Sequence, residues 1–136
     1  MTGFSNYTAS KIIDFVFGNV AYTPPATIYV ALAKGSVVDS DTGTTFAEAN
    51  YTGYSRVAVT NNATTFPNAT NGSKTNGVEF RFPTSTGVDN TIVELVFLDA
   101  ASGGNIIGGG TVAVQKLITT GDRPVYEVGS VTITLN

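Results

Sequence analysis

The stretch FVFGNVAYTPPATIYVALAKG, residues 15–35, decides how the chain is interpreted, because it joins a helix to a strand. Polar N-cap candidates at residues 5–8, followed by apolar residues at helical spacing up to Gly18, predict one helix over residues 5–18. After Pro24 and Pro25, residues 27–33 alternate as a strand does. Since a residue that precedes proline is driven to extended backbone, the diproline predicts a stiff strut between the two elements.

The expected helix has only about three turns, and such a helix is marginal without packing. Its apolar stripe consists of Ala9, Ile12, Ile13, Val16 and Phe17. We expect the helix to cap an open end of the β body and to bury Ile12, Val16 and Phe17 there. The alternative is that part of this surface, including Phe15 beside the stripe, meets a neighbouring subunit.

The rest of the chain has the pattern of short strands separated by turn residues. Strands are expected over residues 54–60, 78–82, 91–98, 106–114, 124–128 and 130–135, with long polar connections at 35–53 and 61–76. This pattern predicts an all-β fold, an antiparallel sandwich or barrel of about seven to eight strands preceded by one short α-helix. No internal repeat or linker interrupts it, so we expect a single domain over residues 1–136, with the β domain at 26–136.

The composition is poor in charge and rich in small polar residues. Charged residues make up 12% of the chain, the net charge is −3, and the seven basic residues are scattered. A basic patch able to hold a phosphate backbone is therefore missing, and we expect no nucleic-acid partner. Surfaces with so little charge do not repel one another, which favours a homo-oligomer.

The chain has no cysteine and no histidine. A disulfide scaffold, a Cys/His zinc site and a histidine-based triad are thus excluded by composition. The apolar runs are shorter than the roughly 20 residues of a membrane helix, and no signal-peptide pattern leads the chain. We expect a protein that is made in the cytoplasm, does not insert into a membrane, and carries no metal or cofactor.

Acidic residues are the remaining candidates for catalysis. Asp39 and Asp41 lie in a long connection, and Asp89, Glu94 and Asp99 flank or occupy one apolar strand. A pair of carboxylates can cleave glycosidic bonds, and apolar surroundings can raise the pKa of a residue such as Glu94. However, a single charge in an apolar strand usually points to solvent or pairs with an arginine, so we expect no catalytic residue.

Three weaker patterns have ordinary structural explanations. Residues 39–43 resemble the start of a calcium loop but lack its later ligands, which favours an Asx-rich turn. Gly108, Gly109 and Gly110 precede a strand and not a helix, so close backbone approach or a bulge explains them better than phosphate binding. Aromatic residues near the Asn-rich loops suit a sugar or protein contact and core anchoring equally well: Phe46, Tyr51, Tyr54 and Phe66.

The first third of the chain resembles a family of small structural proteins of tailed bacteriophages. The resemblance rests on Ser5-Asn6-Tyr7, on the helix ending Val16-Phe17-Gly18, on the stretch from Ala21 to Thr27, on Tyr29 to Leu32, and on the aromatic-x-Arg-x-Ala-Val strand from Tyr54 to Val59. The later segments FLDAASGGNII, TTGD and VTITL are similar more loosely. The connection AKGSVVDSDTG departs from the family pattern, which leaves the shape of that loop open.

The resemblance implies a virion structural protein without catalytic residues, whose partners are other virion proteins, either the major capsid protein or tail proteins. Within the virion we expect a capsid decoration or cement subunit, which would stabilise the assembled head by binding only that state. The first alternative is a tail-fibre or tail-tip component that contacts the host surface. The second alternative, from another class, is a small glycan-cleaving enzyme.

Overall fold

The computed structural model describes residue 1 and residues 3–135 of the chain. In this part of the chain there is one helix, α1 (Asn6–Gly18), which agrees with the expected bounds. The strands are short and are distributed over the rest of the chain: β1 (Gly3–Phe4), β2 (Thr27–Ala33), β3 (Val57–Thr60), β4 (Ser73–Thr75), β5 (Phe80–Arg81), β6 (Asn90–Ile92), β7 (Glu94–Leu98), β8 (Ile106–Val112), β9 (Lys116–Ile118), β10 (Val125–Tyr126) and β11 (Val131–Thr134).

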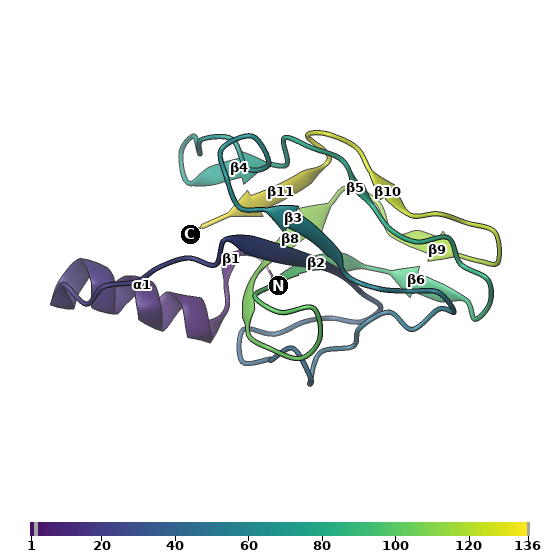
Figure 1. Cartoon of the computed structure of the whole chain (residues 1–136), viewed down its shortest axis with the longest axis horizontal. Helices are drawn as coiled ribbons and strands as arrows, with labels where there is room; N and C mark the ends of the chain where they lie inside the picture. The colour runs from purple at the N-terminus through teal and green to yellow at the C-terminus, as the bar shows by residue number, and fades with distance from the viewer. Residues whose placement is uncertain (2, 136) are drawn as a thin grey trace.

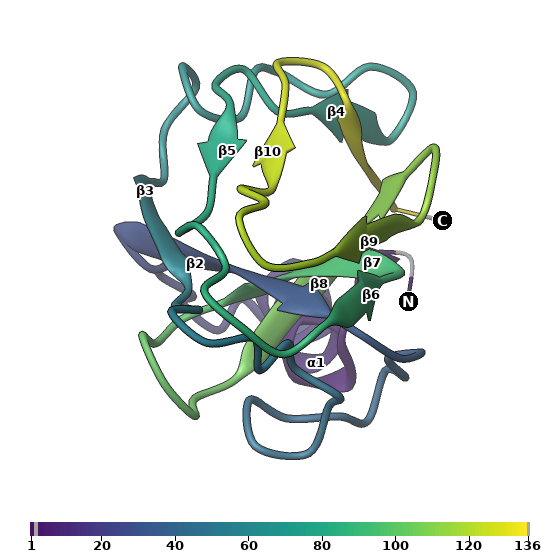
Figure 2. The ribbon, with the colours of Figure 1, turned by 90° about the vertical axis from the view of Figure 1, so that its right-hand side faces the viewer.

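All strand pairs are antiparallel, as the sequence predicted. The main sheet has the order β3-β2-β7-β8-β11-β4, and β1 adds to β8. Two small two-stranded sheets, β5 with β10 and β6 with β9, complete the body. Seen from one end, the strands surround a common interior (Figure 2). The fold is thus a barrel-like all-β body with one short N-terminal helix.

The centre of the main sheet is apolar on both faces, because β2 and β7 alternate between two cores. Ile28, Val30 and Leu32 of β2 point into the larger core inside the barrel. The intervening Ala31 and Ala33 belong to a second cluster on the outer face. The sheet centre is therefore covered on both sides, because successive side chains of a strand point to opposite faces of the sheet.

The connection over residues 35–53 provides the outer cover. It carries Val37 and Phe46 into the second cluster, and both are buried. A backbone hydrogen bond from Lys34 to the carbonyl of Ala47 (2.8 Å) holds the segment against the end of β2. The long polar connection expected from the sequence does run over the surface for most of its length, but two isolated apolar residues dock it on the sheet.

The apolar run over residues 91–98 does not form one strand. Val93 separates β6 from β7 and donates its backbone N–H to the carbonyl of Ala33 (2.9 Å). The two halves then pair with different neighbours, β6 with β9 and β7 with β2 and β8. The sequence also missed β1, β4 and β9, which have only two or three residues each and are too short to show a period of two.

The three glycines in β8 allow backbone to approach closely on both sides. A Cβ atom on Gly108 would lie 2.5 Å from the carbonyl oxygen of Gly3, and one on Gly109 would lie 2.6 Å from that of Met1. At Gly110 the obstacles are the side chains of Val131 and Phe97, at 2.7 and 2.9 Å. The expectation of close approach at these glycines is confirmed.

Candidate interaction surface

Hydrogen bonds at its first turn fix helix α1 to the body. Ser5 is the N-cap, since its Oγ accepts the backbone N–H of Thr8 (3.3 Å), and it also donates through Oγ to the carbonyl of Ile106 in β8. The backbone N–H of Asn6 donates to the carbonyl of Asp39 (2.8 Å). Thr8 is the buried residue of the helix. The sequence signal for an N-cap thus marks the point where the helix is anchored.

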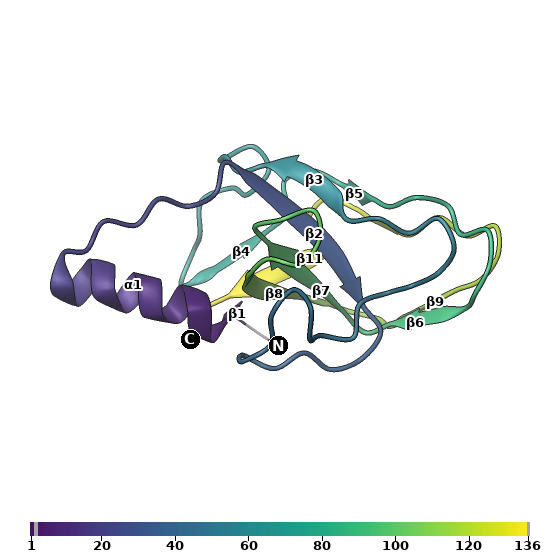
Figure 3. The same cartoon turned by 60° about the horizontal axis from the view of Figure 1, so that its bottom comes forward.

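Beyond this first turn the helix projects away from the barrel (Figures 1 and 3). The exposed fractions are 60% for Ile13, 60% for Val16 and 86% for Phe17, while Phe15 is 52% exposed. The expectation that the helix buries its stripe as a cap on the β body is therefore wrong for Val16 and Phe17. The physical reason is the anchor at Ser5, which fixes the start of the helix on β8 and aims its end outward.

The strap, residues 19–26, returns from the helix to β2. Asn19 ends the helix in the left-handed conformation (φ 52°), so the turn uses this asparagine one residue after the expected Gly18. At the other end, the Asn61 side chain donates to the carbonyl of Pro25 (2.9 Å). Partial burial, with the nearby Tyr7 and Asp99, raises the pKa of the Tyr22 phenol above its usual value. Helix and strap together form the arm, residues 6–26.

A buried arginine connects the loops beside the arm. Arg56 donates Nε and Nη2 to the two carboxylate oxygens of Glu48 (2.7 and 2.9 Å). Its Nη1 donates to the carbonyls of Ala100 (2.7 Å) and Gly103 (2.9 Å), and Nη2 also donates to that of Gly43 (3.1 Å). All five N–H groups of the guanidinium are used. The side chain is 4% exposed.

Tyr54 extends this arrangement to the main sheet. Its hydroxyl donates to Glu48 (2.8 Å) and accepts the backbone N–H of Leu32 in β2 (3.1 Å). Burial, followed by the charge of Glu48, raises the pKa of the Tyr54 phenol. The aromatic-x-Arg pattern of the sequence therefore has a structural function: Tyr54 and Arg56 hold one carboxylate between β2 and two loops. We call Tyr54, Arg56 and Glu48 the clamp.

Two of the acidic candidates, Glu94 and Asp99, lie at the two ends of β7 and have different partners. Glu94 is buried, with 8% exposed, and accepts the backbone N–H of Val37 (2.7 Å) and the amino group of Met1 (2.5 Å). The expectation that it faces solvent or pairs with an arginine is wrong. Asp99 accepts from the backbone and the side chain of Asn105 and closes the turn after β7. Glu94 begins that strand, which puts the two residues roughly 16 Å apart along it.

Residues 39–43 belong to turns that Asp41 stabilises, in agreement with the expected Asx-rich turn. Asp41 accepts the backbone N–H of Val38 (2.9 Å) and the hydroxyl of Thr45 (2.9 Å). Gly43 lies against the loop after β7, where an added Cβ atom would come 1.9 Å from the carbonyl oxygen of Gly103. Within the residues described, no group of three or more acidic residues is placed to hold a metal ion.

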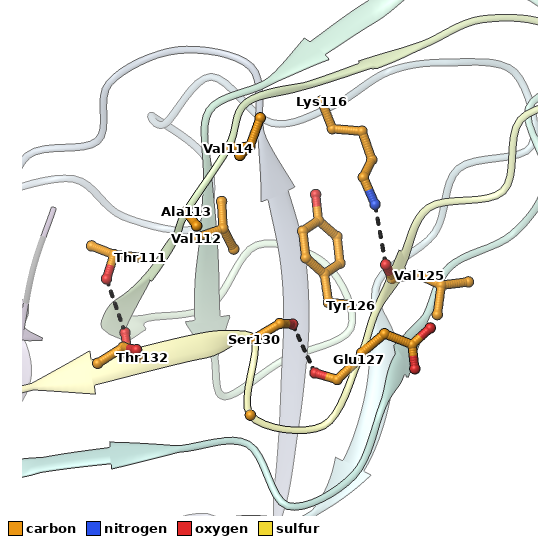
Figure 4. A pocket seen from close by; sticks show the side chains of 11 residues that line it. Thr111, Val112, Ala113, Val114, Lys116, Val125, Tyr126, Glu127, Ser130 and Thr132 are labelled. Carbon is orange, nitrogen blue, oxygen red and sulfur yellow. Dashed lines mark hydrogen bonds between the residues drawn. The ribbon is translucent and has the colours of Figure 1, made fainter.

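A concavity of about 540 Å³ lies between the segment after β8 and the β10–β11 turn (Figure 4). Tyr126 stands in its middle, with the Nζ atom of Lys116 4.6 Å from the ring centre. Two of the polar groups around it are used by the chain itself, since Lys116 donates to the carbonyl of Val125 (3.1 Å) and Ser130 to that of Glu127 (2.7 Å). The buried hydroxyl of Tyr126 has no hydrogen-bond partner, and one such group does not make a ligand site.

The aromatic residues near the Asn-rich loops serve the cores. Phe46 and Tyr51 are buried, and Tyr54 and Phe66 pack against the larger core. Two structural asparagines were missed by the sequence: Asn76, which bonds Val78, Glu127 and Val131, and Asn90, which bonds Asn50, Tyr51 and Asp89. No sequence signal distinguishes them from the other asparagines.

Comparison with known proteins agrees with the resemblance found in the sequence. A search of curated proteins gives no match. The described helix is too short to cross a membrane.

A family model described as "Podophage GP4 fiber I protein gp80" matches residues 3–134, which is nearly the whole chain. This is a family of phage virion structural proteins, so the chain resides in the virion and contacts other virion components. The chain belongs to the family of the podophage GP4 fiber I protein gp80.

Proposed function

We propose that this chain is a structural subunit of a phage tail fibre. The observation that carries the proposal is the family match, whose description names a fibre protein and which extends over residues 3–134. Because of this match we now prefer a tail-fibre component, the first alternative drawn from the sequence, over capsid decoration, which rested on size and composition. Decoration of the head is the rival that an experiment has to exclude.

The shape of the molecule supports this proposal. The arm lies at one end of the long axis, and the small sheets β5–β10 and β6–β9 lie toward the other (Figure 1). The turn near that far end is polar, with Asp122 accepting from the backbone and hydroxyl of Thr119 (2.9 and 3.0 Å), although Leu117 of β9 is 59% exposed. A subunit with a projecting apolar arm at one end is suited to a fibre, where neighbouring subunits hold that end.

We further propose that the chain works by binding and not by catalysis. Glu94 and Asp99 stand at opposite ends of β7, whereas the carboxyl groups of glycosidases lie about 5–10 Å apart. Both carboxylates accept hydrogen bonds that close local structure. Replacing Glu94 by glutamine should thus reduce stability without removing any turnover of host glycans. A loss of such turnover in a folded variant would favour the enzyme alternative.

Removal of the chain from its phage tests the main proposal. A fibre subunit predicts particles with intact, heat-resistant heads that adsorb poorly to host cells. A decoration subunit predicts the reverse, normal adsorption with heads that lose their contents at lower temperature or at altered salt. Complementation with the intact chain should restore adsorption. Normal adsorption combined with fragile heads would overturn the fibre proposal.

A further inference from the structure

The apolar face of the arm continues onto the body and forms one surface. At 100° per residue, Ala9, Ile12, Ile13, Val16 and Phe17 fall within an arc of about 140° on the helix. Lys11 and Asp14 lie on the other side of the helix. Near the anchor, the stripe borders a groove of about 570 Å³ that it shares with Phe4 and Leu135.

The groove leads into an apolar pocket at the end of the barrel. This pocket has a volume of about 300 Å³ and shares Phe4 and Leu135 with the groove. Its wall includes side chains of the larger core and its margin, namely Ile28, Phe66, Phe97, Ile107 and Ile133. We call the stripe, the groove and the pocket the crook. The crook thus contains a protruding apolar part, around Phe17, and an apolar hollow.

The chain cannot close the crook on itself. Phe17 lies eleven residues along the helix from Asn6, which corresponds to about 16 Å. The pocket is at the anchored end, because Phe4 and Gly108 line it next to Ser5. The hydrogen bonds of Ser5 to β8 hold that end of the helix in place. The protruding part of one chain can therefore reach a hollow only in another chain.

The helix itself requires a partner. It has 13 residues, with no acidic residue in its first turn and no basic residue in its last, so side chains do not complement its dipole. A helix of this length is marginal in water, and most of its stability has to come from packing of its apolar face. In the single chain that packing is partial: Ala9 and Ile12 are half-buried, whereas Ile13, Val16 and Phe17 are exposed.

We propose that the crook is covered by a second copy of this chain. The stripe carries no charge, and residues 15–33 contain no charged residue, so identical arms meet without repulsion. The ionisable residues that line the crook are Asp39 in the groove and Lys74 in the pocket, which have opposite charges and can pair between copies. A surface that carries a protruding apolar part, an apolar hollow and two opposite charges is complementary to the same surface on a second copy.

The exposed apolar side chains supply about half of the area that such a contact needs. Ile13, Val16, Phe17 and Leu135 are 60%, 60%, 86% and 50% exposed. With about 200 Å² for an aromatic and about 150 Å² for an aliphatic side chain, they leave roughly 400 Å² of apolar surface per chain. This is about half of the 800 Å² that each partner contributes to a standard interface. The groove, the pocket and the uncharged strap add to it.

Sedimentation velocity and light scattering of the purified full chain, from about 1 to about 100 µM, test this inference. We expect a dimer or larger homo-oligomer. Phe17→Ser should raise the dissociation constant at least about a hundredfold, because about 170 Å² of apolar area is no longer buried. The matched control is Phe15→Ser in the same helix, which is off the stripe and should leave assembly unchanged. Circular dichroism verifies that both exposed-site variants remain folded.

Three results would overturn the inference. The first is a wild-type chain that stays monomeric throughout this range, including one that associates only with another virion protein. The second is a Phe17→Ser variant that assembles as the wild type does. The third is an equal loss of assembly in the two variants. The inference rests on the proposed function and names the partner of the arm, but the two proposals can be refuted separately. An oligomer that is located on heads would refute only the fibre function. A monomer that is located on fibres would refute only the contact between copies through the crook.

Discussion

Replacement of Arg56 by alanine should unfold the clamp and remove a large part of the protein's stability. The guanidinium is 4% exposed and uses all five donors, two on Glu48 and three on the carbonyls of Gly43, Ala100 and Gly103. Loss of one partner from a buried ion pair costs about 3–5 kcal/mol. Glu48 is 26% exposed, so water recovers part of its solvation and the expected loss is about 4 kcal/mol.

This loss is large on the scale of a small protein. Native chains of this size are stable by only about 5–15 kcal/mol, and 1 kcal/mol corresponds to about 4 °C in melting temperature at this length. Arg56→Ala should therefore melt about 15 °C below the wild type. Arg56→Lys keeps the charge but loses the planar fork, so it should recover less than half of the difference.

Urea titration and thermal melting, both followed by circular dichroism, measure the effect. The matched control is Arg81→Ala, which breaks an ion pair with Glu79 (3.0 Å) in which the two side chains are 51% and 41% exposed. Exposed pairs contribute about 0–1 kcal/mol, so the control should melt within about 4 °C of the wild type. If Arg56→Ala is no more destabilising than Arg81→Ala, the reasoning about the clamp is refuted.

Two further predictions concern the buried tyrosines. Tyr54→Phe should reduce the free energy of unfolding by about 1–3 kcal/mol, because Glu48 and the N–H of Leu32 each lose a partner. Tyr126→Phe should be neutral or stabilising by about 1 kcal/mol, because the buried Tyr126 hydroxyl has no hydrogen-bond partner. Urea titration of both variants measures the two effects, and a reversed order would contradict the assignment. Burial raises the pKa of Tyr51 to about 12 from 10.0, so above pH 10 the folded state keeps a proton that the unfolded state loses. The contribution of Tyr51 to stability is therefore complete below pH 10 and is lost between pH 10 and 12. The melting temperature should be lower at pH 11 than at pH 8 by the equivalent of about 1 kcal/mol or more, and equal melting temperatures would contradict this prediction.

Local features of the fold could be predicted from the sequence. Helix α1 was located to within a residue because Ser5 and the apolar spacing are both local signals. The alternation over residues 27–33 correctly indicated the strand β2, and the glycines of β8 indicated close backbone approach. In each case the information lies within a few residues of the element that it specifies.

Features that depend on distant residues could not be predicted. The stripe on α1 indicates that Val16 and Phe17 prefer burial, but the same pattern serves a cap on the chain's own body and a contact with another molecule. Its direction is set by the bonds of Ser5 to β8, about 100 residues later in the chain. The clamp likewise joins Arg56 to loops that no periodicity connects. Long-range side-chain contacts of this kind have no signature in a single sequence.

The same limit applies to the candidate site. Glu94 was a candidate because apolar neighbours can raise the pKa of a carboxylate. In the structure this carboxylate accepts hydrogen bonds from Val37 and Met1. The sequence ranked Phe15 as a possible contact residue, yet Phe17 is the more exposed aromatic of the helix. The family resemblance, based on the first third of the chain, was more informative than any single residue.

Electron cryomicroscopy of intact particles of the phage that encodes this chain tests the central claim most directly. The account predicts density for the β body with its projecting helix in fibres at the tail, where each copy contacts another copy through the arm. Copies arranged over the head lattice, with none at the tail, would contradict it.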